Sequence, residues 1–134
     1  YTRKLILKEM GIDFQIVVRP IDEKSLGDRS EDAPRDLVLN LGQAKMDYLV
    51  QEIKAGRCQA ELSSYEKDRS WIVLTGDQVV TCQDVILEKP ESVEEAKDFV
   101  RRYAESPPST VGSCVLTHLP SGLHVSGVDT ATIH

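Results

Sequence analysis

Residues 71–80, Trp-Ile-Val-Leu-Thr-Gly-Asp-Gln-Val-Val, form a β-type run with a carboxylate and an amide in its middle. The apolar residues on both sides predict a buried strand. Because burying an ionised carboxylate without a partner is costly, something must pair with Asp77. In a protein that mixes helices and strands, such an acid often serves as a metal ligand or general base at the mouth of a cleft. The alternative is an Asp that only caps a turn.

Length and composition exclude several classes of protein. The chain has 134 residues and enough apolar side chains for a core, so we expect a single domain over 1–134. Its formal charge of -6 argues against a non-specific nucleic-acid or anionic-membrane surface. A phosphorylated small molecule can still bind, because a divalent cation held by carboxylates reverses the local charge. No apolar run has the length of a membrane span, and Cys58, Cys82 and Cys114 predict free thiols in a reducing, cytoplasmic compartment.

Helical and strand periods alternate along the first half of the chain. Residues 1–10 predict a helix that ends at Gly11, and residues 14–18 predict a strand. A polar loop over 24–33 leads to a long helix that begins near Pro34. The apolar stripe of this helix consists of Leu37, Val38, Leu41, Ala44, Tyr48 and Leu49. The polar segment 54–70 predicts a mobile surface insertion.

The second half alternates in the same way. Residues 85–87 predict a short strand, joined to the preceding strand by a hairpin connection at 81–84. Ser92 and Glu95 form a capping box, and the helix that follows runs to about residue 104. Its inward residues are expected to be Val93, Ala96, Phe99, Val100 and Tyr103. Residues 110–119 and 123–133 alternate apolar and polar residues around Pro-Ser-Gly, which predicts a β-hairpin.

Two lysines lie where a cation can meet a ligand. Lys45 falls inside the apolar stripe of the long helix, where it needs an anion unless its stem snorkels toward the helix edge. Lys89 follows a strand and precedes a helix, so it either reaches a ligand over the sheet edge or remains an exposed loop residue.

The polar residues at inward positions and loop ends together suit one kind of chemistry. Carboxylates hold Mg²⁺ or Mn²⁺ and position water, while Lys and Arg neutralise phosphate oxygens. The combination therefore predicts metal-assisted phosphate chemistry. His118, His124 and His134 are better explained as exposed strand residues than as bases. The candidate residues are Arg3, Lys4, Asp22, Glu23, Lys45, Asp77, Gln78 and Lys89.

The order of these motifs resembles the Maf family, the septum-formation-inhibitor-like nucleoside triphosphate pyrophosphatases. The resemblance implies an α/β fold, with a mixed sheet flanked by helices and two lobes around a central nucleotide-binding cleft. It also implies metal-dependent hydrolysis of a nucleoside triphosphate to the monophosphate and pyrophosphate. The implied substrates include nucleotides with a modified base. A homodimer is compatible with the resemblance. The matching segments are Tyr1-Thr-Arg-Lys-Leu-Ile-Leu with Gly11, Ile21-Asp-Glu23, Gln43-Ala-Lys45, Gly76-Asp-Gln-Val-Val80, Glu88-Lys-Pro90 and Glu94-Glu-Ala96.

The resemblance assigns catalytic roles to four of the candidates. Asp77 would activate water or bind the metal, and Glu23 would be the second metal-binding carboxylate. Lys45 and Lys89 would contact the phosphates. The implied cofactor is a divalent metal, Mg²⁺ or Mn²⁺.

Substrate binding would involve Arg3, Lys4 and Gln78. The Asp77-Gln78 pair resembles the branch of the family associated with methylated guanosine and pyrimidine triphosphates. The sequence departs from the family pattern at both ends, where a Ser-rich turn and a segment with Ala-Gly and Ile-Gln-Gly patterns are expected. We therefore expect residues 1–134 alone to be loosely packed and nearly inactive. A non-catalytic nucleotide-binding or regulatory remnant of the same fold is the alternative function.

Overall fold

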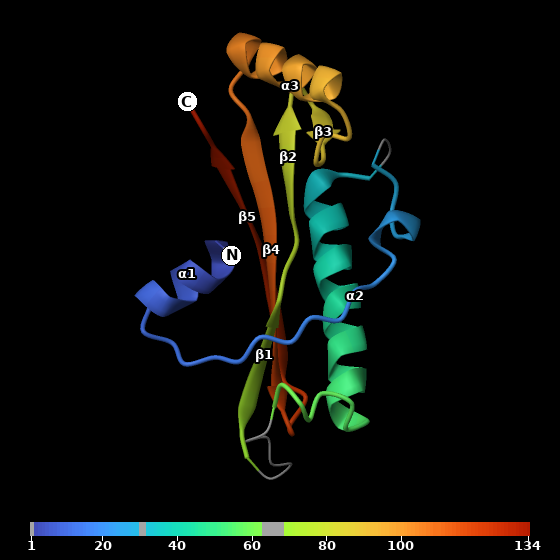
Figure 1. Cartoon of the computed structure of the whole chain (residues 1–134), viewed down its shortest axis with the longest axis vertical. Helices are drawn as coiled ribbons and strands as arrows, with labels where there is room; N and C mark the ends of the chain where they lie inside the picture. Colours follow the sequence, from blue (N-terminus) through green and yellow to red (C-terminus); the bar gives the residue numbers. More distant parts are fainter. Residues whose placement is uncertain (1, 30–31, 63–68) are drawn as a thin grey trace.

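The computed structural model describes residues 2–29, 32–62 and 69–134. These residues form a five-stranded sheet with helices on both sides, which confirms the predicted α/β class (Figure 1). Every described strand pair is antiparallel, whereas a mixed sheet was expected. Short turns join two of the four pairs, β2 with β3 and β4 with β5, and such turns can join only antiparallel strands. The elements are α1 (Thr2–Glu9), the 3-10 helix η1 (Glu23–Ser25), α2 (Pro34–Lys54), β1 (Trp71–Thr75), β2 (Gln78–Cys82), β3 (Val85–Leu87), α3 (Val93–Glu105), β4 (Ser109–Leu119) and β5 (His124–Thr132).

The long strand β4 organises the sheet. One of its edges pairs with β1 and β2, and the other pairs with β5 over residues 109–117. Thr75 lies opposite Val115 and Gln78 lies opposite Gly112, so the register continues unchanged from β1 into β2. β3 pairs with β2 only from Val80 onward. Within the described part of the chain, residues 76 and 77 therefore have a partner strand on one side only.

The predicted continuous strand over 71–80 is interrupted at Gly76 and Asp77. The carbonyl of Asp77 accepts the Ser113 N–H at 2.8 Å, as in a regular ladder. The Asp77 N–H, however, donates to the Ser113 hydroxyl at 3.1 Å rather than to a backbone carbonyl. The direction of the strand is kept while the ladder opens, which frees backbone polar groups at this point.

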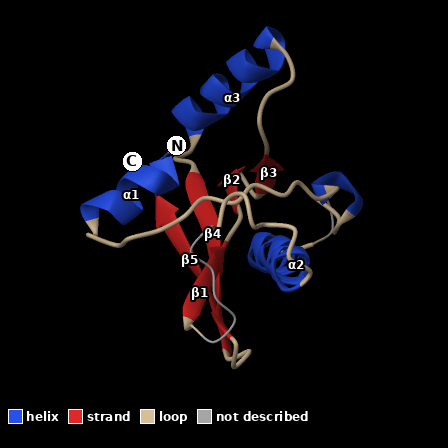
Figure 2. Cartoon of the chain, turned by 60° about the horizontal axis from the view of Figure 1, so that its bottom comes forward, coloured by secondary structure: helices blue, strands red, loops and turns tan. Residues whose placement is uncertain are grey.

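Helix α2 covers one face of the sheet and confirms the predicted long amphipathic helix (Figures 1 and 2). Tyr48 is partly exposed, although it belongs to the predicted stripe. The core beneath α2 forms where its apolar stripe packs on the strand residues whose side chains point toward the helix. Its members include Leu37, Val38, Leu41 and Met46 from the helix and Val73, Val79, Val111 and Val115 from the strands.

The strand predicted over 14–18 is wrong. This segment runs from α1 toward α2 as an extended coil, with Ile16 51% and Val18 72% exposed. Only Val17 packs against the core. The segment ends at Arg19, which donates to Glu61 Oε1 at 2.8 Å and to the Arg57 carbonyl at 2.9 Å. A strand needs a partner edge as well as an alternating pattern, and this segment is fastened by side-chain bonds instead.

The segment 54–70 is not wholly a surface feature. After α2 ends at Lys54, Cys58 is 2% exposed and joins the core cluster of Met46 and Ile53. Leu62 packs against the same cluster. Residues 63–68 of the predicted insertion lie outside the described residues.

Helices α1 and α3 are where predicted, but they pack less than their patterns suggest. In α3, the hydroxyl of Ser92 caps the Glu95 N–H at 3.1 Å, whereas Glu95 Oε2 accepts from the Glu91 N–H instead of closing the box on Ser92. Phe99 is the buried residue of this helix, and the predicted inward residues Val93 and Val100 are exposed. Helix α1 has no buried residue.

The terminal hairpin of β4 and β5 confirms the prediction. Cys58, Cys82 and Cys114 are free thiols, as expected. Among the helices of the described residues, none is long and apolar enough to cross a membrane.

Candidate active site

Asp77 lies at the opening in the ladder, held by its backbone. The Ser113 hydroxyl accepts a hydrogen bond from the Asp77 N–H, and it donates one to the Val38 carbonyl of α2 at 2.5 Å. By strand alternation, Asp77 shares the face of Val73 and Val79, which α2 covers. The predicted partner for this half-buried carboxylate therefore has to come from the helix.

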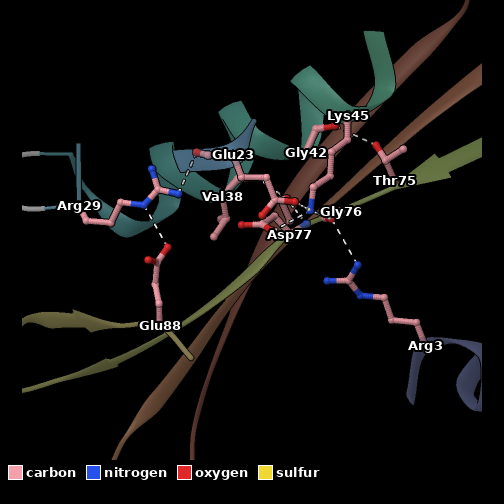
Figure 3. A network of polar contacts seen from close by, with 11 residues as sticks. Arg3, Glu23, Arg29, Val38, Gly42, Lys45, Thr75, Gly76, Asp77 and Glu88 are labelled. Atoms are coloured by element: carbon pink, nitrogen blue, oxygen red, sulfur yellow. Dashed lines mark hydrogen bonds and ion pairs between the residues drawn. The ribbon is translucent and has the colours of Figure 1, made fainter. Parts of the chain in front are cut away.

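Lys45 is that partner. It extends from the inward side of α2, and its Nζ lies 2.9 Å from Asp77 Oδ1 and 2.9 Å from Glu23 Oε1 (Figure 3). Partial burial lowers the pKa of Lys45, but its hydrogen bonds to Glu23 and Asp77 outweigh that effect, so the net pKa is raised. The ammonium therefore stays charged at neutral pH. Of the two sequence alternatives for Lys45, pairing with an anion is confirmed.

Glu23 reaches Lys45 from the short helix η1, which Arg29 fastens in place. The Arg29 guanidinium donates to the Glu23 carbonyl at 3.1 Å and to Glu88 Oε1 at 3.0 Å (Figure 3). It also donates to the Leu26 carbonyl. Glu88 follows β3 directly, so this guanidinium connects the loop that carries Glu23 to the edge of the sheet. The position of Glu23 thus depends on residues far apart in the sequence.

Arg3 approaches the same point from the opposite side of the sheet. Its Nη1 lies 3.3 Å from the Gly76 carbonyl oxygen, which also lies 3.5 Å from Lys45 Nζ. Because the Asp77 carbonyl points toward β4, backbone alternation turns the Gly76 carbonyl toward the unpaired edge. α1 and α2 lie on opposite sides of the sheet, so the two cations meet across this free edge (Figures 1 and 2).

The comparisons with known proteins identify the family of this chain. The family model described as Maf-like protein matches residues 1–134. The chain belongs to the Maf family. It is 33% identical, over 98% of its length, to a protein of Dictyostelium discoideum named 7-methyl-GTP pyrophosphatase. It is 35% identical, over 71% of its length, to a dTTP/UTP pyrophosphatase of Vibrio parahaemolyticus, and 29% identical, over 74%, to one of Bacillus thuringiensis.

These relatives are longer than the chain. It spans 62% of the Dictyostelium protein and 41% and 42% of the two bacterial proteins. The family predicted from the motifs is confirmed, and the described structure locates the motif residues of this Maf-like chain relative to one another.

The predicted site residues do not all meet. Glu23, Lys45 and Asp77 form one cluster, and Arg3 reaches its edge. Gln78 is exposed and begins β2 beside the cluster. Lys4 and Lys89 are exposed, and neither makes an ion pair or hydrogen bond with the cluster in the described part of the chain. Their roles stay predictions.

Two residues that hold the cluster were not singled out from the sequence. The Ser113 hydroxyl accepts a hydrogen bond from the Asp77 N–H, and the Arg29 guanidinium donates to the carbonyl of Glu23. The alternation of β4 offered a signal for Ser113, because a hydroxyl there takes the place of an apolar residue on the face that α2 covers. For Arg29 no local signal existed, since it lies in a polar loop and its partners come from two segments, the η1 turn at residues 23–26 and Glu88 after β3.

The carboxylates suit a hard divalent cation. Both Glu23 Oε1 and Asp77 Oδ1 approach one cation-sized position, the one taken by Lys45 Nζ. Among the described residues, no three or more His, Cys, Asp or Glu side chains are arranged so that they could hold a metal ion together. Mg²⁺ needs only one or two carboxylates when water and substrate phosphates complete its shell, so Glu23 and Asp77 would be sufficient protein ligands for it.

The close packing at Gly76 gives a testable prediction. A Cβ added to Gly76 would overlap the backbone carbonyl oxygen of Ser113. A backbone atom cannot move aside in the way that the flexible end of a side chain can. We expect Gly76→Ala to lower the free energy of unfolding by about 1–3 kcal/mol, as overpacking typically does. Urea unfolding measures this, with Gly127→Ala as the control, because a Cβ at Gly127 meets nothing within 4 Å. Equal stability of both variants would contradict the close approach.

Proposed function

We propose that this Maf-like chain forms the catalytic centre of a nucleoside triphosphate pyrophosphatase. The observation that carries the proposal is the cluster in which Lys45 Nζ lies 2.9 Å from both Asp77 and Glu23 at a free strand edge. The names of the relatives support the same reaction, and they point to 7-methyl-GTP, dTTP and UTP as the first substrates to test.

The cluster supplies the groups that this reaction needs. A triphosphate at the free edge would lie between the guanidinium of Arg3 and the ammonium of Lys45, which neutralise its oxygens. Asp77 would take a proton from water as the water oxygen bonds to the α-phosphorus. The bond from that phosphorus to the bridging oxygen breaks, and pyrophosphate leaves with the electron pair.

A divalent cation would complete the centre. Glu23 and Asp77 are the residues that would hold it, and it would stabilise negative charge on the phosphate oxygens. Lys45 would then exchange its carboxylate partners for phosphate, since one position cannot hold both cations. The cation is thus expected to bind together with the nucleotide.

The test is a nucleotide screen with two products measured. The 134-residue chain is incubated with canonical and 7-methylated nucleoside triphosphates and Mg²⁺ or Mn²⁺, and pyrophosphate and orthophosphate are quantified separately. The Asp77→Asn chain serves as the blank, so that a low rate is still measurable. We expect metal-dependent pyrophosphate above this blank. Release of orthophosphate instead would overturn the reaction type, and triphosphate binding without any release would select the non-catalytic alternative.

A further inference from the structure

The face of the sheet opposite α2 carries a hollow of about 490 Å³. Arg3 and Asp77 line one part of it, and residues of β2, β4 and β5 line the rest. α1 lies on this side of the sheet (Figures 1 and 2). The size falls in the range of small-molecule sites, and the hollow begins at the free edge where Arg3 and Lys45 meet.

The strand register determines how the hollow is built. Gln78 lies opposite Gly112, and Gly112 lies opposite Asp129, so these residues form one row across three strands. In the next row, Cys114 lies opposite Gly127. The glycines leave a floor of bare backbone between the Gln78 amide and the Asp129 carboxylate. With strands spaced about 4.8 Å apart, the two walls stand roughly 10 Å from each other, which leaves room for a flat ring.

Asp129 gives this floor a chemical preference. Within the described residues, Asp129 has no ion-pair partner, and Arg3 is the cation that lines the hollow. A carboxylate accepts hydrogen bonds best from two adjacent N–H groups. Guanine presents such a pair on its Watson–Crick edge, whereas uracil and thymine place one N–H between two carbonyl oxygens that a carboxylate repels.

We propose that Gln78, Gly112, Gly127 and Asp129 form the base-binding floor of this site, and that Asp129 selects guanine over pyrimidine bases. The inference rests on the proposed function, because it assumes that the triphosphate lies at Arg3 and Lys45. A 7-methylguanine ring carries a positive charge, so the same carboxylate favours it further.

The first test measures selectivity at Asp129. Dissociation constants for GTP, 7-methyl-GTP, UTP and inorganic tripolyphosphate are measured by calorimetry with Mn²⁺. Asp129→Asn should weaken binding of both guanine nucleotides by roughly tenfold or more, the effect of losing a charge-assisted hydrogen bond. UTP and tripolyphosphate should bind as before. An equal loss for all four ligands, or no loss for any, would overturn the assignment.

The second test fills the floor without disturbing the fold. A Cβ at Gly127 meets nothing within 4 Å, so Gly127→Val should keep the unfolding midpoint while blocking the base. Nucleotide binding should fall by roughly tenfold or more and tripolyphosphate binding should not change, because about 1.4 kcal/mol of lost contact is a factor of ten. Ser126→Val is the control, since Ser126 is exposed on the other face of β5.

Different results would contradict the proposed function and the proposed base site. Tripolyphosphate that does not bind to the unaltered chain would sink the proposed function itself. Tripolyphosphate that binds, together with nucleotide affinities unaffected by both variants, would overturn the base site alone.

Discussion

Asp77→Asn should lower the rate of pyrophosphate release by roughly 10²-fold or more, the usual cost of losing a general base. The amide keeps an oxygen that can accept the Lys45 hydrogen bond, and the backbone bonds between Asp77 and Ser113 do not involve the side chain of residue 77. Lys45 also retains Glu23 as an ionic partner. We therefore expect the structure to persist and the unfolding temperature to change little or to rise.

The rate is best measured with the chain in excess over nucleotide, so that a single turnover is followed. Asp98→Asn is the matched control, because Asp98 also accepts a hydrogen bond from a cation, Arg102, at 3.0 Å, but on the exposed face of α3. It should leave the rate unchanged. Turnover close to normal in Asp77→Asn would remove Asp77 from the chemistry.

The sequence was sufficient to find two residues of the cluster, because each of them breaks a local pattern. Asp77 interrupts a β-type run, and Lys45 interrupts an apolar stripe. A buried position tolerates a charge only when a partner of opposite charge is near. Asp77 therefore indicates a nearby cation, and Lys45 indicates a nearby anion. The structure joins them at 2.9 Å.

The sequence was insufficient where packing or pairing decides the outcome. Residues 14–18 have the β-branched and aromatic composition of a strand, yet no strand of the described residues pairs with them. Val93 and Val100 fall on the predicted inner side of a helix that buries mainly Phe99. The row of Gln78, Gly112 and Asp129 was invisible for the same reason, since it exists only once the register of three strands is known.

Replacing Lys45 by methionine should separate the structural role of its ammonium from its role toward phosphate. The unbranched apolar stem is retained, so α2 should still pack on the sheet. Loss of a hydrogen bond to a charged group costs about 1.5–3 kcal/mol, which corresponds to roughly 10- to 150-fold weaker triphosphate binding. Turnover should fall as well, because the phosphate charge is less well neutralised.

The same variant should bind divalent cations better than the unaltered chain. Without Lys45, Asp77 and Glu23 face one position with no cation between them, and metal-free Lys45→Met should lose about 1–3 kcal/mol of stability. Mn²⁺ can take that position without displacing an ammonium, and a ligand that binds the folded state raises its stability. Mn²⁺ should therefore raise the unfolding temperature more in Lys45→Met than in the unaltered chain.

Lys97→Met is the control for both measurements, because Lys97 pairs with Glu94 on the exposed face of α3 and should respond neither to nucleotide nor to Mn²⁺. If Lys45→Met loses stability while nucleotide affinity and turnover stay normal, Lys45 serves only to neutralise the two carboxylates. If Mn²⁺ stabilises both proteins equally, the metal does not compete with the ammonium, and its ligands must lie elsewhere. The combination expected here, weaker nucleotide binding with stronger metal stabilisation, requires that Lys45 and the metal use the same pair of oxygens.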